Sequence, residues 1–127
     1  MADNQPHILL AEDDAALGTI LAFNLGAAGF NVARAGDGQE AWEMAQQASF
    51  DLVLTDYQMP KMTGIQLFHH LRALPAYADT PLLLMTALSR TLDLPTLCDG
   101  LNVLTVFPKP FSPAEVVMTV RNCLQPC

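Results

Sequence analysis

Five short apolar runs alternate with helix-length segments along the 127 residues of this chain. The runs predict strands at residues 7–11, 30–35, 51–55, 81–86 and 103–107. Strand–helix alternation repeated in this way, with strands that are apolar along almost their whole length, indicates a parallel sheet covered by helices on both faces. We therefore expect an α/β doubly wound fold, and the length fits one domain spanning residues 1–127.

Residues with reactive or metal-binding side chains stand where four of these strands end. Glu12 and Asp13 follow the first strand, Asp56 follows the third, Thr86 ends the fourth, and Lys109 follows the fifth. The carboxyl ends of parallel strands open onto one edge of a sheet, where such folds bind ligands. The sequence therefore predicts that these five residues share one site.

The same residues lie in four short motifs, LLAEDD at residues 9–14, TDYQMPKMTG at 55–64, MTA at 85–87 and KPF at 109–111. Their order and spacing resemble the receiver domain of two-component response regulators, over nearly the whole chain. The resemblance implies a five-stranded parallel sheet with the flavodoxin-like strand order 2-1-3-4-5 and helices on both faces.

The resemblance also implies a role for each acidic residue. Asp56 would take a phosphoryl group from a phosphohistidine of a partner kinase. Glu12, Asp13 and Asp56 would hold Mg²⁺, together with the backbone carbonyl of Gln58. Clustered carboxylates repel one another and so favour a bound cation, and phosphoryl transfer depends mainly on positioning and charge neutralisation.

Two further residues complete the site that the resemblance implies. Lys109 would place a positive charge against the phosphoryl group, and Thr86 would donate its hydroxyl to a phosphoryl oxygen. The resemblance further implies a cis peptide bond between Lys109 and Pro110, although only about 5–6% of X–Pro bonds in folded proteins are cis.

The chain departs from the receiver pattern in two places. Many receivers carry an aromatic residue three positions before the lysine, whereas this chain has Val106 there and Phe107 one place later. Val106 is too small to act as the rotating aromatic marker. In addition, Pro95 interrupts the segment that should form the fourth helix, so we expect that helix to be short or irregular.

Composition limits the partners of the chain. The formal net charge is −7 without any basic cluster, so we expect no direct contact with nucleic acid. No apolar run in the sequence reaches the roughly eighteen residues needed to span a bilayer, so we expect no membrane partner. The chain has 3 cysteines, and their spacing indicates no disulfide framework. The N-terminal residues do not resemble a signal peptide, so the expected location is the cytoplasm.

These observations predict a signalling switch rather than a metabolic enzyme, with catalysis limited to accepting and hydrolysing its own phosphoryl group. The expected partners are a sensor histidine kinase or phosphotransfer protein and an output protein or domain of unknown identity. A homodimer through the face of the fourth and fifth strands and helices is a further possibility. Whether the chain acts alone or belongs to a longer regulator stays open.

Three alternatives compete with this interpretation. A pseudo-receiver would keep the fold but switch without phosphorylation, and the complete set of site residues argues against it. A phosphatase of the haloacid dehalogenase type needs a second acidic residue two positions after its nucleophile, where this chain has Gln58. A flavodoxin-like FMN protein needs a Ser/Thr/Gly-rich phosphate loop after the first strand, and this chain lacks it there.

Overall fold

The computed structural model of the protein describes residues 5–87 and 100–124. Five strands form one parallel sheet in the order β2-β1-β3-β4-β5, so the expected fold class is confirmed. The strands are β1 (His7–Ala11), β2 (Asn31–Ala35), β3 (Leu52–Asp56), β4 (Leu82–Thr86) and β5 (Val103–Pro108). The helices are α1 (Ala15–Ala27), α2 (Gly38–Gln47), α3 (Gly64–Arg72) and α5 (Pro113–Leu124), with a short 3-10 helix, η1 (Pro75–Tyr77). Among these described helices, none combines the length and the apolar character that crossing a bilayer requires.

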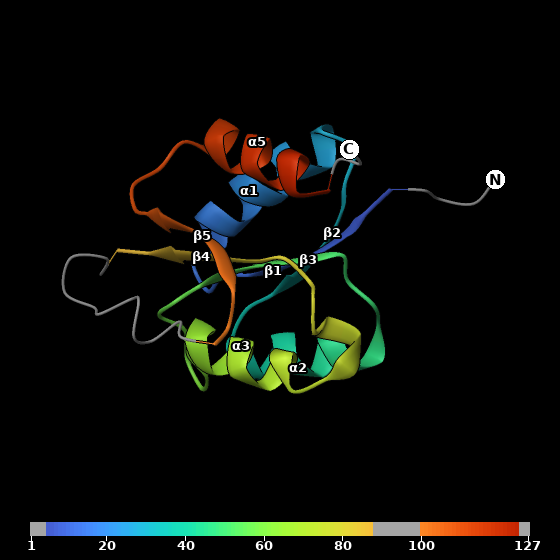
Figure 1. Ribbon diagram of the computed structural model, residues 1–127. Helices are drawn as coiled ribbons and strands as arrows, with labels where there is room; N and C mark the ends of the chain where they lie inside the picture. Colours follow the sequence, from blue (N-terminus) through green and yellow to red (C-terminus); the bar gives the residue numbers. More distant parts are fainter. Residues whose placement is uncertain (1–4, 88–99, 125–127) are drawn as a thin grey trace.

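The sheet separates two apolar layers. Helices α1 and α5 cover one face, and α2 and α3 cover the other (Figure 1). Successive side chains of a strand point to opposite faces, so Ile8 and Leu10 of β1 pack in the α1/α5 layer, while Leu9 and Ala11 pack in the α2/α3 layer. The central strands β1 and β3 are buried over most of their length, so polar groups reach solvent only at the strand ends.

The helices begin at the same edge of the sheet where the strands end, and a polar side chain caps each of the four. The carboxylate of Asp14 accepts hydrogen bonds from the first turn of α1, and Asp37 does the same for α2. Thr63 caps α3 through a reciprocal capping box, and the hydroxyl of Ser112 accepts from Ala114 N at the start of α5. Ser112 at the cap and Pro113 at the first helical position form a start signal that can be read from the sequence.

Four of the five strands differ from their predicted bounds by one residue, at one end or at both. Strand β2 begins at Asn31 rather than at Phe30, because the Phe30 N–H donates to Leu25 O and so belongs to the C-terminal turn of α1. That turn passes through Gly29 at φ 102°, a conformation that glycine adopts without strain. The expected irregular fourth helix falls on residues 88–99, which lie outside the described part of the chain.

Candidate functional site

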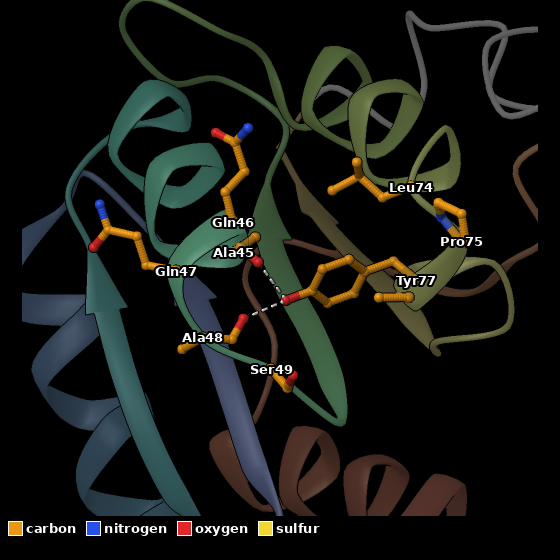
Figure 2. A pocket seen from close by; sticks show the side chains of 9 residues that line it. Ala45, Gln46, Gln47, Ala48, Ser49, Leu74, Pro75 and Tyr77 are labelled. Atoms are coloured by element: carbon orange, nitrogen blue, oxygen red, sulfur yellow. Dashed lines mark hydrogen bonds between the residues drawn. The ribbon is translucent and has the colours of Figure 1, made fainter.

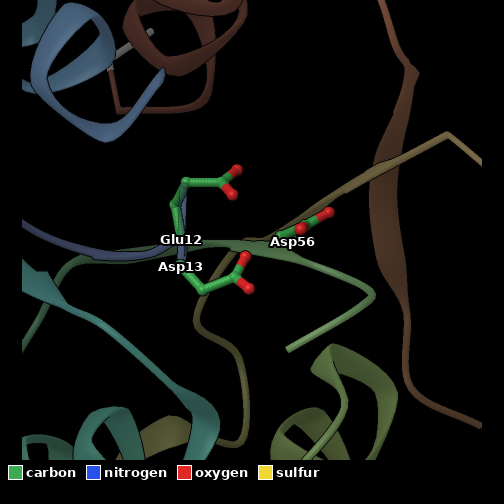
Figure 3. Close-up of side chains that lie close together, drawn as sticks. All are labelled: Glu12, Asp13 and Asp56. Atoms are coloured by element: carbon green, nitrogen blue, oxygen red, sulfur yellow. The ribbon is translucent and has the colours of Figure 1, made fainter. Parts of the chain in front are cut away.

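Three carboxylates meet at the carboxyl edge of the two central strands. Glu12 and Asp13 follow β1, and Asp56 is the last residue of β3 (Figure 3). The Glu12 N–H donates to Ala35 O at 3.1 Å, which continues the β1–β2 pairing one residue beyond the strand. One carboxylate oxygen from each of the three residues lies within 4.8 Å of the other two. The structure therefore brings together three of the residues that the sequence places at strand ends.

Lys109 joins this cluster from the end of β5. Its Nζ lies 3.2 Å from Glu12 Oε1 and 3.3 Å from Asp56 Oδ1. The backbone N–H of Lys109 donates to Thr86 O at 2.9 Å, which extends the pairing of β4 with β5 up to the site. Glu12 and Asp56 are only 4% and 5% exposed, whereas Asp13 is exposed. The ammonium group therefore pairs with the two carboxylates that have lost most of their water.

Burial dominates the electrostatics of the two covered carboxylates. It raises the pKa of Glu12, although a hydrogen bond from the Asp14 N–H and the nearby Lys109 both act in the opposite direction. Burial likewise raises the pKa of Asp56, against the attraction of Lys109. For Lys109, burial alone lowers the pKa, but attraction to Asp56 and Glu12 outweighs it, and the pKa is raised.

Within residues 5–87 and 100–124, one ammonium group faces three carboxylates, so these groups carry an excess of negative charge. Such an excess of hard oxygen ligands suits a divalent cation such as Mg²⁺, which uses one or two carboxylates together with water and phosphate oxygens. Gln58 is exposed and lines, together with Asp13, a cavity of about 410 Å³ beside the cluster. The residues present therefore fit a bound Mg²⁺.

The loop that follows Asp56 is held close to the sheet by backbone contacts. The Tyr57 N–H donates to Met85 O at 2.8 Å, and the Gly64 N–H donates to Tyr57 O at 2.9 Å. A Cβ atom on Gly64 would lie 2.5 Å from Asp56 O, so only glycine lets α3 begin so near the end of β3. This explains why the motif at residues 55–64 ends in glycine.

The remaining predicted residues lie at the same edge. Thr86 ends β4 and is 1% exposed, and the small Ala87 that follows it is exposed. The Lys109–Pro110 peptide bond is cis, as the resemblance implied.

Strand β5 carries the departure from the aromatic pattern. Val106 is half-buried and packs in the α2/α3 layer, whereas Phe107 is buried in the α1/α5 layer with its ring centroid 5.8 Å from that of Phe111. Neighbouring residues of a strand point to opposite faces. Phe107 therefore does not take the place of an aromatic residue at position 106.

Sequence reasoning missed Arg72, at the end of α3. Its guanidinium donates to four backbone carbonyl oxygens, at 2.7 Å to each of Leu101, Tyr77 and Thr80, and at 3.3 Å to Asn102. These contacts connect the end of α3 to the turns that precede β4 and β5. A single arginine in the last turn of a helix gives no sequence signal for such a role.

Tyr77 was also missed. Its hydroxyl lies 2.8 Å from the carbonyl oxygens of both Ala45 and Ala48, across a cavity of about 400 Å³ between the end of α2 and η1 (Figure 2). Both segments precede strands, so this cavity lies at the amino edge of the sheet, away from the carboxylates. Burial raises the pKa of the Tyr77 hydroxyl, which keeps it a donor.

Comparison with known proteins agrees with this geometry. Residues 8–121 match the family described as "Response regulator receiver domain". The DNA-binding dual master transcriptional regulator RpaA of Synechocystis sp. is 33% identical over 120 residues, which make up 94% of this chain and 49% of RpaA. The chemotaxis protein CheY4 of Vibrio cholerae superposes with a TM-score of 0.86 and 28% identity, over 94% of this chain and 99% of that chain.

A third likeness concerns the fold alone, because its sequence identity is 24%. It is the receiver domain of the sensor histidine kinase PA1611 from Pseudomonas aeruginosa, solved with a magnesium ion coordinated in the active site cleft. It superposes with a TM-score of 0.83 and covers 93% of this chain and 96% of that chain.

The chain spans about half the length of the curated relatives it matches. The expectation of no direct nucleic-acid contact is not supported by the comparisons. RpaA is a DNA-binding regulator, and the net charge of this chain says nothing about the half of RpaA that the match does not cover. The match over residues 8–121, on a parallel sheet with the acidic cluster at its carboxyl edge, assigns the family. The chain belongs to the response regulator receiver domains, the phosphorelay modules of two-component signalling.

Proposed function

We propose that Asp56 accepts a phosphoryl group from a phosphohistidine on a sensor histidine kinase or phosphotransfer protein. The observation that carries this proposal is the cluster of three carboxylates around Asp56, with the Lys109 ammonium group in contact with it. An Asp56 carboxylate oxygen forms the O–P bond while the N–P bond of phosphohistidine breaks. The imidazole nitrogen keeps the electron pair of that bond and takes a proton from solvent.

Glu12, Asp13 and Asp56 would hold Mg²⁺, with the backbone carbonyl of Gln58 as a further ligand. The bound cation supplies neutralisation of the charge on the transferring phosphoryl oxygens. The Glu12 side chain already contacts Lys109 and the Asp14 N–H, so binding a cation costs it little further conformational entropy.

Lys109 and Thr86 approach the phosphoryl group from the strands on the other side of Asp56. The Lys109 Nζ already lies 3.3 Å from Asp56 Oδ1, so a small movement brings it onto a phosphoryl oxygen. Thr86, buried at the end of β4, donates its hydroxyl to a second oxygen. Both residues carry the change in charge at Asp56 into strands β4 and β5.

The output is a shift between two arrangements of the β4–β5–α5 side of the domain. Exposed apolar side chains on that side, Leu104 on β5 at 57% and Met118 on α5 at 65%, support contact with an output protein or with a second copy of the chain. Catalysis is confined to phosphorylation and dephosphorylation of Asp56 itself, so the domain acts as a switch.

Intact mass spectrometry tests this function directly. After incubation with Mg²⁺ and acetyl phosphate, we expect a gain of one phosphoryl group that mild base removes. The gain should be absent from Asp56→Ala and from a sample containing EDTA. No gain, together with no binding of Mg²⁺ or beryllofluoride, would instead identify a pseudo-receiver that switches without phosphorylation.

A further inference from the structure

Residues 35–38, which connect the end of β2 to the first residue of α2, contact both chain segments that supply the acidic site. On one side, the hydrogen bond from the Glu12 N–H to Ala35 O connects the end of β2 to the segment that carries Glu12 and Asp13. On the other side, Gly38 packs against the backbone of Met62, in the loop that follows Asp56. This connection therefore lies between the two segments and contacts each of them.

Gly38 makes this close approach possible because it has no side chain. It is the first residue of α2 and is buried. A Cβ atom at this position would overlap the Met62 carbonyl oxygen and would lie 2.6 Å from Met62 Cβ. Distances this short are essentially never adopted by real Cβ atoms, so the loop has to move away if any side chain is introduced.

The loop is held at the turn by two other contacts. The Met62 side chain is partly buried against the core of the α2/α3 layer. Lys61 Nζ lies 3.6 Å from Asp37 Oδ2, although the lysine is 67% exposed and such a pair contributes little on its own. Backbone packing and the Met62 side chain therefore carry most of the attachment.

The attached loop also carries Gln58, which lines the cavity beside the carboxylates together with Asp13. A displacement of Met62 is transmitted along only four residues to Gln58, and the Gly64 N–H bond to Tyr57 O closes the loop behind it. Gln58 and Met62 therefore lie in one short loop whose two ends are joined by a hydrogen bond, so we expect a shift of Met62 to change the position of Gln58.

We propose that Gly38 is a positioning residue of the metal site: by admitting the Met62 backbone against the first turn of α2, it keeps the loop of residues 57–63 beside Glu12, Asp13 and Asp56. This inference rests on the proposed function, because it assumes that the carboxylates and this loop bind Mg²⁺ together. Gly38 touches none of the ligands and acts only through the loop.

Calorimetric titration with Mg²⁺ alone tests the proposal, with Gly38→Ala compared to Gly36→Ala. A Cβ atom on Gly36 meets only Glu40 Oε1, at an ordinary 3.5 Å, so this substitution in the same turn is a matched control. We expect Gly38→Ala to raise the Kd for Mg²⁺ about tenfold, the effect typical of changes behind the ligands themselves. Gly36→Ala should stay within about twofold of the unaltered protein.

A second pair of variants covers the case in which Gly38→Ala does not fold. Met62→Ala removes the side chain that anchors the loop to the core, and Met118→Ala removes an exposed methionine from α5 as its control. We expect Met62→Ala to raise the Kd about threefold, and Met118→Ala to leave it unchanged. Circular dichroism of each metal-free variant establishes that it is folded at the temperature of the titration.

A positioning role also predicts rescue by excess metal. At saturating Mg²⁺, the rate of phosphorylation of Gly38→Ala by acetyl phosphate should return to within about twofold of the unaltered protein. An unchanged Kd in folded Gly38→Ala, or in Met62→Ala where that is the variant studied, would overturn the proposal while leaving the proposed function intact. Absence of Mg²⁺ binding by the unaltered protein would overturn both.

Discussion

Replacing Asp56 by asparagine should stabilise the metal-free protein while removing its response to Mg²⁺. Asparagine has nearly the same shape as aspartate but carries no charge. In the metal-free site, Asp56 is repelled by the carboxylates of Glu12 and Asp13, and Lys109 is the one cation that lies against it in the described part of the chain. The substitution therefore removes two repulsions at the cost of one attraction.

The distances in the site set the size of this effect. With an effective dielectric constant of about 20, the attraction across 3.3 Å to Lys109 is roughly 5 kcal/mol. Each repulsion across 4.8 Å or less is at least about 3.5 kcal/mol. The repulsions exceed the attraction by about 2 kcal/mol, and water around the exposed Asp13 reduces this to about 1–2 kcal/mol. For a domain of this length, that difference corresponds to a rise in Tm of about 4–8 °C.

Differential scanning calorimetry in EDTA and again in excess Mg²⁺ measures both parts of the prediction. Glu43→Gln is the control, because it removes one negative charge from an exposed position on α2 and so reports the general effect of net charge. The unaltered protein and Glu43→Gln should gain stability from Mg²⁺, whereas Asp56→Asn should gain almost none. A lower Tm for metal-free Asp56→Asn than for the unaltered protein would refute the reasoning.

The structure supports three further predictions. Because burial raises the pKa of Glu12 and Asp56, the folded metal-free protein binds protons more tightly than the unfolded chain, and its stability should fall as pH rises through those raised pKa values. Mg²⁺ competes with the same protons, so the Tm gain that it gives should shrink as the pH falls toward those raised pKa values, which calorimetry at a series of pH values would show. Arg72→Ala should lower the free energy of unfolding, measured by urea denaturation, by about 2–4 kcal/mol, because four carbonyl oxygens lose their donor. A loss no larger than that of Arg121→Ala, at an exposed position of α5, would contradict this prediction. Tyr77→Phe should cost about 1–2 kcal/mol by the same assay, and an unchanged midpoint would show that its hydroxyl bonds do not stabilise the fold.

The parts of the fold that follow from local pattern were predictable from the sequence. Apolar runs located all five strands to within one residue at each end, because strands buried on both faces must be apolar throughout. The start of α5 followed from Ser112 and Pro113, since capping depends on neighbouring residues only. The grouping of Glu12, Asp13 and Asp56 followed from parallel topology, which brings strand ends together whatever the details of packing.

Contacts between segments far apart in the sequence were not predictable in this way. Arg72 finds its acceptors at Leu101 and Asn102, about thirty positions later, and nothing near Arg72 signals that distance. The approach of Gly38 to Met62 is of the same kind, because a glycine at a helix start reads equally well as an ordinary turn residue. Such contacts depend on how two finished elements pack, which is a property of the folded chain.

The ion pair between Lys109 and Glu12 joins residues 97 positions apart, and this separation bears on the protein while it is being synthesised. Glu12 and Asp56 leave the ribosome early, but their cationic partner arrives only after β5 has been made. Domains fold as units during translation, so a nascent chain that ends before β5 holds its acidic residues without the lysine. In such a chain no ammonium group from β5 offsets the negative charge of Glu12 and Asp56, so the acidic edge of the sheet is completed only when the last strand is in place.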